Sequence, residues 1–173
     1  MHSCVLMLPL SLTLALIFSP AVNAQSAETD LKAAKQPQVD ARLSSVLDAA
    51  DVRYTALDSG DLEVLAALPD GRRQRVILRS QTHTYRREEW REVYAIAHEL
   101  PTDSTPPPAL LERLLLDNDS LALGAWSVAR GRISLTLRLP ARSSPLRVVE
   151  AIDFAAEVAD ALERELEGDQ DQR

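Results

Sequence analysis

Cysteine, lysine and aromatic residues are scarce in this sequence. The chain of 173 residues has one cysteine, Cys4, and only 4% aromatic residues, and its only lysines are Lys32 and Lys35. Because Cys4 lies near the start of the chain, nothing after it can form a disulfide or a cysteine metal site. The fold must therefore rely on an apolar core, and the length is sufficient for one ordinary domain.

The motifs that usually mark an enzyme are also missing. We find no G-x-S-x-G elbow, no H-E-x-x-H pair and no glycine-rich phosphate loop. His83 and His98 lie apart in the strand register that we expect, so they are not predicted to share a metal. The net charge of −7 argues against nucleic acid as a partner. We therefore expect no catalytic residues, no metal and no cofactor.

The N-terminus resembles a secretion signal. An uncharged apolar run, "CVLMLPLSLTLALIFSP", precedes "VNA" and then the polar "QSAETD". Small residues at Val22 and Ala24 fit signal peptidase, so we predict a signal peptide over residues 1–24, cleavage after Ala24 and a periplasmic or secreted protein. The competing interpretation is an uncleaved N-terminal anchor. Residues 25–38 are polar and predict a disordered tether.

Hydrophobic periodicity predicts one domain over residues 39–167 and a disordered tail over 168–173. A first helix begins at Val39, and strands follow at 51–57, 61–68, 73–85 and 90–100. A helix over 108–118, two strands within 121–140 and a long helix over 145–168 complete the chain. This α-β-β-β-β-α-β-β-α order predicts an α+β fold with a mainly antiparallel sheet of about five to six strands.

The stretch "LALGAWSVARGRISLTLRLP", residues 121–140, reads as a tight hairpin around Arg130 and Gly131. In that register Trp126 faces Leu135, and the apolar residues of both strands share one side. The long helix adds its own apolar seam. The predicted core therefore includes Gly124, Trp126, Leu135, Leu137 and Ile152.

The opposite side of that hairpin carries Leu121, Leu123 and Ala125, followed by polar residues. Either a helix covers these three residues or they form an exposed apolar strip. In the second case we expect a face for a protein partner.

Arginines crowd into one short region of the chain. Two interpretations are open: these side chains balance the acidic helices or face water, or they form a basic patch for an anionic partner. The residues are Arg72, Arg73, Arg75, Arg79, Arg86, Arg87 and Arg91.

The segments "LLERLLLDNDSLALGAWSVARGRISLTLRLP" and "LRVVEAIDFAAEVADALERE" resemble the YbjN family of bacterial sensory-transduction regulators. Here Trp126 follows Gly124 and Ala125 where phenylalanine is more usual. The resemblance implies a fold like that of type III secretion chaperones, which bind other proteins and often dimerise. It implies no catalytic residues. The predicted signal peptide is a departure, because those chaperones act in the cytoplasm.

Together these features predict an exported, non-enzymatic protein-binding or chaperone-like module of the cell envelope. Its partner would be another protein or a second copy of itself, and its only membrane contact would be the transient signal peptide. A small-ligand sensor or carrier, with a pocket under the proline-rich connector "PTDSTPPP", is the alternative. An enzyme is a third hypothesis.

Overall fold

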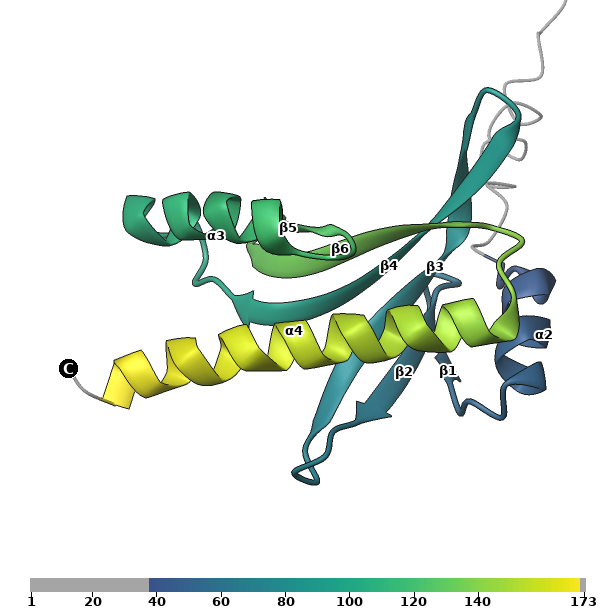
Figure 1. Cartoon of the computed structure of the whole chain (residues 1–173), viewed down its shortest axis with the longest axis horizontal. Coiled ribbons are helices and arrows are strands. Elements are labelled where there is room, and N and C mark those ends of the chain that lie inside the picture. Colours follow the sequence, from purple (N-terminus) through teal and green to yellow (C-terminus); the bar gives the residue numbers. More distant parts are fainter. Residues whose placement is uncertain (1–37, 172–173) are drawn as a thin grey trace, which may run out of the picture. The chain divides into compact units, whose positions relative to one another are not determined.

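A computed structural model describes residues 38–171, with side chains described for residues 38–168 (Figure 1). The predicted signal peptide, all but the last residue of the predicted tether, and residues 172–173 lie outside this range. The order of elements confirms the predicted α+β class. The elements are α2 (Ala41–Ala49), β1 (Thr55–Ala56), β2 (Leu62–Ala67), β3 (Arg73–Tyr85), β4 (Glu88–Glu99), α3 (Pro108–Ser120), β5 (Ala125–Ala129), β6 (Arg132–Pro140) and α4 (Pro145–Asp171).

The six strands form one antiparallel sheet in the order β1-β2-β3-β4-β6-β5. Alternate residues of the strands point to one face, where Val64, Val76, Ala95 and Leu135 follow one another across the sheet in register and are buried. α4 crosses this face and contacts β2, β3, β4 and β6 (Figure 1). The core therefore lies between α4 and the sheet.

The packing of α4 follows from its sequence. Buried residues recur three or four positions apart, as an amphipathic helix requires, and include Val148, Ile152, Ala155 and Ala159. The alanines among them are fully buried, so the helix lies close to the strands. α2 adds Leu43 and Leu47 to this core cluster at one end, and α3 adds Leu114 at the other.

The helices thus pack on one face of the sheet, and no helix of the described range covers the other. That second face carries Glu63, Ile77, Tyr94 and Thr136 in register across four strands. Apart from Ile77, which is only 2% exposed, these residues carry polar groups, so the face can stay in contact with water. We call it the open face.

Several predicted boundaries were wrong; β4, for example, begins at Glu88 rather than at residue 90, and α3 ends at Ser120 rather than at residue 118. The strand expected over 51–57 contains only β1, because Asp51 takes φ 54° and the Val52 N–H donates to the Leu47 carbonyl at 3.0 Å, which extends the end of α2. α4 continues to Asp171, past the stop predicted at Gly168, since this glycine lacks the positive φ of a helix cap. The first helix begins at Ala41 rather than Val39.

Within residues 38–171, no helix combines the length and the hydropathy that crossing a membrane would need.

Candidate functional site

The hairpin of β5 and β6 has the predicted register. Trp126 pairs with Leu135 and Val128 with Ile133. The two turn residues, Arg130 and Gly131, both have positive φ values of 53° and 70°, the pattern of a type I′ turn. The predicted core residues Trp126, Leu135, Leu137 and Ile152 are buried, although Val128 is 40% exposed.

Gly124 is not part of the core, contrary to the prediction. It is exposed, lies one residue before β5 and has φ +76°. A Cβ at this position would stand 2.5 Å from the Thr136 carbonyl oxygen and 3.0 Å from Leu137 Cγ. Glycine is therefore required by the turn that leads into β5 and by the close approach of β6.

The turn at Gly124 also divides the predicted partner face. Because β5 begins at Ala125, Leu121 and Leu123 lie in the loop before it and do not continue its alternation. Leu121 packs against the core, Leu123 is 40% exposed, and Ala125 alone stands on the open face. The three residues therefore do not form one strip. The alternation of apolar residues in the sequence does not indicate the positive φ of Gly124, which interrupts the strand.

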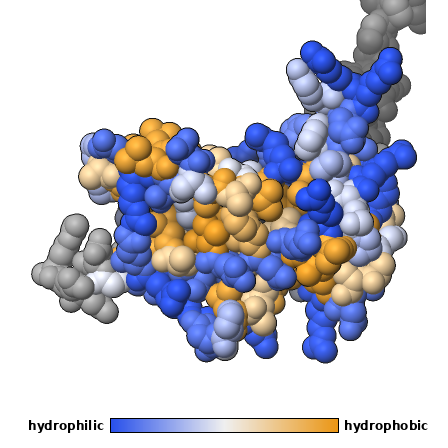
Figure 2. Space-filling view, viewed as in Figure 1, coloured by the Kyte–Doolittle hydropathy of each residue, from blue (hydrophilic) through white to orange (hydrophobic). Residues whose placement is uncertain are grey.

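A different apolar surface lies along α3 and β5. α3 places Leu114 in the core but leaves Leu111, Leu115 and Leu116 exposed by 36%, 71% and 68%. Figure 2 shows apolar side chains on α3 and between α3 and α4. A groove of about 280 Å³ runs between α3 and β5, and we call its lining the α3–β5 surface. The lining residues are Leu111, Leu114, Leu115, Asn118, Trp126 and Val128.

The side chain of Asn118 links α3 by hydrogen bonds to β5, the last strand of the sheet. β5 is an edge strand, so one side of its backbone has no neighbouring strand. The Trp126 N–H donates to Asn118 Oδ1 at 2.6 Å, and Asn118 Nδ2 donates to the Trp126 carbonyl at 3.4 Å. The side-chain amide thus takes the place of a strand partner at this residue, which protects the edge.

The open face contains a polar basin of about 360 Å³ over β4, β6 and β5. Its hollow arises because alanine, serine and threonine side chains on β5 and β6 are short, while the residues around them are long. Ser127 Oγ lies 3.2 Å from Thr136 Oγ1 and 3.3 Å from the Ser134 carbonyl oxygen. The short residues and the adjoining tyrosine are Tyr94, Ala125, Ser127, Ala129, Ser134 and Thr136.

Long charged side chains surround this basin. Arg138 donates to Glu92 Oε1 at 3.0 Å across β4 and β6, and both residues line the basin. Arg79 pairs with Asp61 at 3.5 Å, and Arg132 pairs with Glu99 at 3.5 Å. The remaining lining arginine, Arg130, makes no ion pair within residues 38–168.

The arginines of the predicted basic patch do not form a single patch. Arg72 reaches α4 and pairs with buried Asp160 at 2.9 Å, and Arg75 pairs with Glu63 at 3.4 Å. Arg79 borders the basin. Arg75 is exposed all the same, as are Arg73, Arg86 and Arg87, which make no ion pair among residues 38–168. Arg86 stacks over the Tyr85 ring, 5.5 Å from its centroid. Most of the predicted patch is thus neutralised within the fold.

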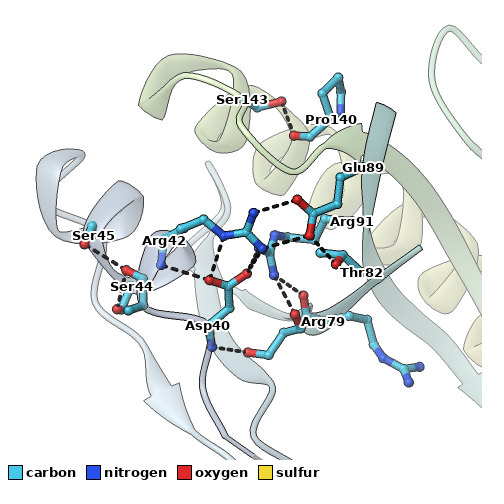
Figure 3. Close-up of polar contacts among 12 residues, drawn as sticks. Asp40, Arg42, Ser44, Ser45, Arg79, Thr82, Glu89, Arg91, Pro140 and Ser143 are labelled. Atoms are coloured by element: carbon cyan, nitrogen blue, oxygen red, sulfur yellow. Dashed lines mark hydrogen bonds and ion pairs between the residues drawn. The ribbon is translucent and has the colours of Figure 1, made fainter. Parts of the chain in front are cut away.

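Among the arginines of the predicted patch, Arg91 differs most from the prediction, because it is buried. It is only 3% exposed and lies on the helix side of β4, beside a bulge of β3 between Leu78 and Thr82 (Figure 3). Its guanidinium donates to Asp40 Oδ2 at 2.6 Å and to the carbonyls of Arg79 and Ser80. A bulge leaves carbonyls without ladder partners, so Arg91 is a structural residue.

Asp40, Arg42 and Glu89 join Arg91 in one cluster of ion pairs, which we call the clasp. Asp40 caps α2, and Arg42 bridges it to Glu89 with bonds of 2.7 and 2.6 Å (Figure 3). Hydrogen bonds from Arg42 hold the pKa of Asp40 far below its usual range. The pKa of Glu89 falls to about 2, first through Arg42 and then through Thr82. The clasp joins α2 to the β3–β4 hairpin and stays ionised at neutral pH.

The remaining predictions concern the pocket at the proline-rich connector and the two histidines. A hollow of about 470 Å³ does lie beside the proline-rich connector, but its lining is mostly polar and includes Glu99, Thr102 and Arg130. His83 pairs in register with Trp90 and His98 with Ile133, on different strand pairs. Within the described part of the chain, no three histidine, cysteine or acidic residues gather as a metal site would require.

Comparison with known proteins adds no relative. No protein-family model matches the chain, and no curated protein matches it. The YbjN resemblance therefore remains a prediction from the residues quoted above.

Proposed function

We propose that this protein is an exported, non-enzymatic module, YbjN-like and similar to type III secretion chaperones, that binds another protein through the α3–β5 surface. The observation that carries the proposal is the exposure of three leucines on α3 beside an apolar groove. Scattered surface leucines are ordinary, but a contiguous apolar surface that borders a groove is typical of an interaction site.

The energetics favour a polypeptide partner. Leu115 and Leu116 are 71% and 68% exposed, so they contribute little to the core while they remain in water. Burying a leucine side chain is worth about 1.5–3 kcal/mol. The exposed leucines of α3 together with Val128 can therefore supply a hot spot of several kcal/mol, which is the order of magnitude at the centre of specific interfaces.

Charge around the groove indicates the chemistry of the partner. α3 carries Glu112, Asp117 and Asp119, and its only basic residue, Arg113, is paired with Asp117 and with Glu165 of α4. α3 therefore carries a net negative charge. We expect an apolar segment flanked by lysine or arginine, because such a segment complements both the groove and the charge of the helix beside it.

A small apolar ligand is the second candidate, since the groove includes Trp126 and its volume of about 280 Å³ is near the lower limit for ligand pockets. Its position between α3 and β5 differs from the connector pocket that the sequence suggested. A single small molecule in the groove would leave Leu116, which is not part of the groove lining, in water.

The test is co-purification of the tagged full chain from its native host. The variant Leu111→Glu/Leu115→Glu places charges on the α3–β5 surface, while Leu146→Glu alters a leucine of α4 that is 68% exposed and serves as the control. Thermal unfolding of each variant verifies the fold. The proposal predicts a stoichiometric protein partner that is lost only from the double variant.

Retention of the same partner by the double variant would contradict the proposal. A small molecule released on denaturation, with no protein partner, would favour the second candidate. Mass spectrometry of the purified complex distinguishes these outcomes.

A further inference from the structure

The basin on the open face is a second site, and Trp126 is the one residue that its lining shares with the α3–β5 surface. Arginines reach it from three directions: Arg79 from β3, Arg138 from β6, and Arg130 with Arg132 from the β5–β6 turn. One carboxylate, Glu92, lines the same hollow, while Asp61 and Glu99 pair with Arg79 and Arg132 from outside the lining. Four arginines against three carboxylates leave a local excess of positive charge in a protein whose net charge is −7.

Short hydroxyl side chains supply the second half of the site. Ser127 and Thr136 lie together beneath the arginines on facing strands and are only partly buried. A hydroxyl can both donate and accept hydrogen bonds. A guanidinium offers a fork of donors that matches a carboxylate or a phosphate group. The combination suits a ligand with several oxygen atoms and more than one negative charge.

We propose that this basin binds a small anion bearing two or more carboxylate or phosphate groups. The volume of about 360 Å³ is in the range of small-molecule sites and accommodates such a ligand. Arg130 is the primary anchor, because it makes no ion pair within residues 38–168 and lies in the two-residue turn beside Gly131. Arg138 is the second anchor.

The contact between Arg138 and Glu92 gives the proposal its most specific consequence. Glu92 Oε1 accepts from Arg138 Nε at 3.3 Å and from its terminal nitrogen at 3.0 Å. A ligand carboxylate or phosphate would compete for these same donors. Removing the Glu92 charge should therefore strengthen anion binding, whereas removing Arg138 should weaken it.

The experiment is calorimetric titration of the full chain with citrate and, separately, with pyrophosphate, against sodium chloride at matched ionic strength. Arg130→Asn is the first variant, because asparagine tolerates the positive φ of the turn and should not harm folding. Arg138→Gln is the second and Glu92→Gln the third. Arg142→Gln/Arg147→Gln removes two exposed arginines that do not line the basin and serves as the control.

We expect one binding site, with affinity about ten-fold lower in Arg130→Asn and in Arg138→Gln. Glu92→Gln should bind more tightly than the wild type, and the control should bind as the wild type does. Binding of citrate alone would assign a carboxylate ligand, and binding of pyrophosphate alone a phosphate ligand, each in support of the site. Absence of heat with both probes, or equal weakening in the control, would overturn it.

Discussion

At the scale of single residues, backbone conformation and ion pairing decide the role of a side chain more than its hydropathy does. Gly124 and Trp126 are two positions apart in the sequence, yet Trp126 is 8% exposed and Gly124 lies in an exposed turn. Arg91 belongs to an arginine-rich segment, yet it is as buried as the core leucines. Both assignments depend on contacts with distant parts of the chain.

Replacement of Gly124 by valine should destabilise the protein by at least about 2 kcal/mol, because a branched residue is strained at φ +76°. The added Cβ would also meet the Thr136 carbonyl oxygen at 2.5 Å. Urea unfolding measures the loss. Gly71 has φ +82° with open space around it, so Gly71→Val separates backbone strain from the clash. An equal loss in both variants would contradict a role for the clash.

Arg91→Ala should lower the free energy of unfolding by about 3 kcal/mol, because it leaves two carbonyls of the β3 bulge without this donor and takes from Asp40 one of its two arginine partners. Arg91→Lys should cost less, since an ammonium can still satisfy part of the set. Arg87→Ala, at the exposed tip of the hairpin, should stay within about 0.5 kcal/mol of the wild type. If Arg91→Ala resembled Arg87→Ala in urea unfolding, the structural role of the clasp would be wrong.

The clasp also predicts how stability depends on pH. The pKa of Glu89 is lowered to about 2, so its contribution is present above the ordinary pKa of a glutamate and is lost as the pH falls from about 4.5 towards 2. Asp40 acts in the same direction. Urea midpoints should therefore fall with pH in this window, and Glu89→Gln should make the fall shallower. A variant as steep as the wild type would exclude Glu89 as a source.

At the scale of elements, α3 stands apart from the other helices. It has one buried leucine, and the strand that it contacts is β5 at the edge of the sheet. The side chain of Asn118 and an ion pair between Arg113 and Glu165 of α4 add polar attachments. A helix held by so few contacts can present its remaining leucines to a partner.

Asn118→Ala should release the backbone of Trp126 at the free edge of β5. The cost should be about 1 kcal/mol, as for one ordinary hydrogen bond. Hydrogen exchange of the Trp126 amide should become faster, because its acceptor at 2.6 Å is gone. Asn118→Asp keeps an acceptor and should preserve more of the protection. Unchanged exchange in Asn118→Ala would show that the amide does not protect the edge.

Elements were more predictable than the contacts between them. The assignment of β3 and β4 as strands, the two-residue turn at Arg130 and Gly131, and the seam of α4 rest on local patterns, and each was confirmed. The pairing of β4 with β6 is not local, so sequence reasoning did not place Glu92 beside Arg138 or Tyr94 beside Thr136. The basin was missed for that reason, although polar residues of the hairpin after Ala125 were already predicted to share one face.

At the scale of the whole molecule, the described helices pack on one face of the sheet and leave the other open to water. The helix face ends in the apolar α3–β5 surface, and the open face holds the arginine-lined basin. Each surface suits a different chemistry: apolar burial on one side and charge-assisted hydrogen bonding on the other. The two proposals can therefore fail independently.

The central claim is that the α3–β5 surface binds a protein partner, and site-specific photo-crosslinking in the native host tests it most directly. A photoreactive amino acid replaces Leu115 on α3 in one variant and Ser127 on the open face in another. We expect a discrete protein adduct from position 115 that disappears when Leu111→Glu is added, and no such adduct from position 127. Failure of position 115 to give an adduct, or equal adducts from both faces, would show that the α3–β5 surface is not the binding site.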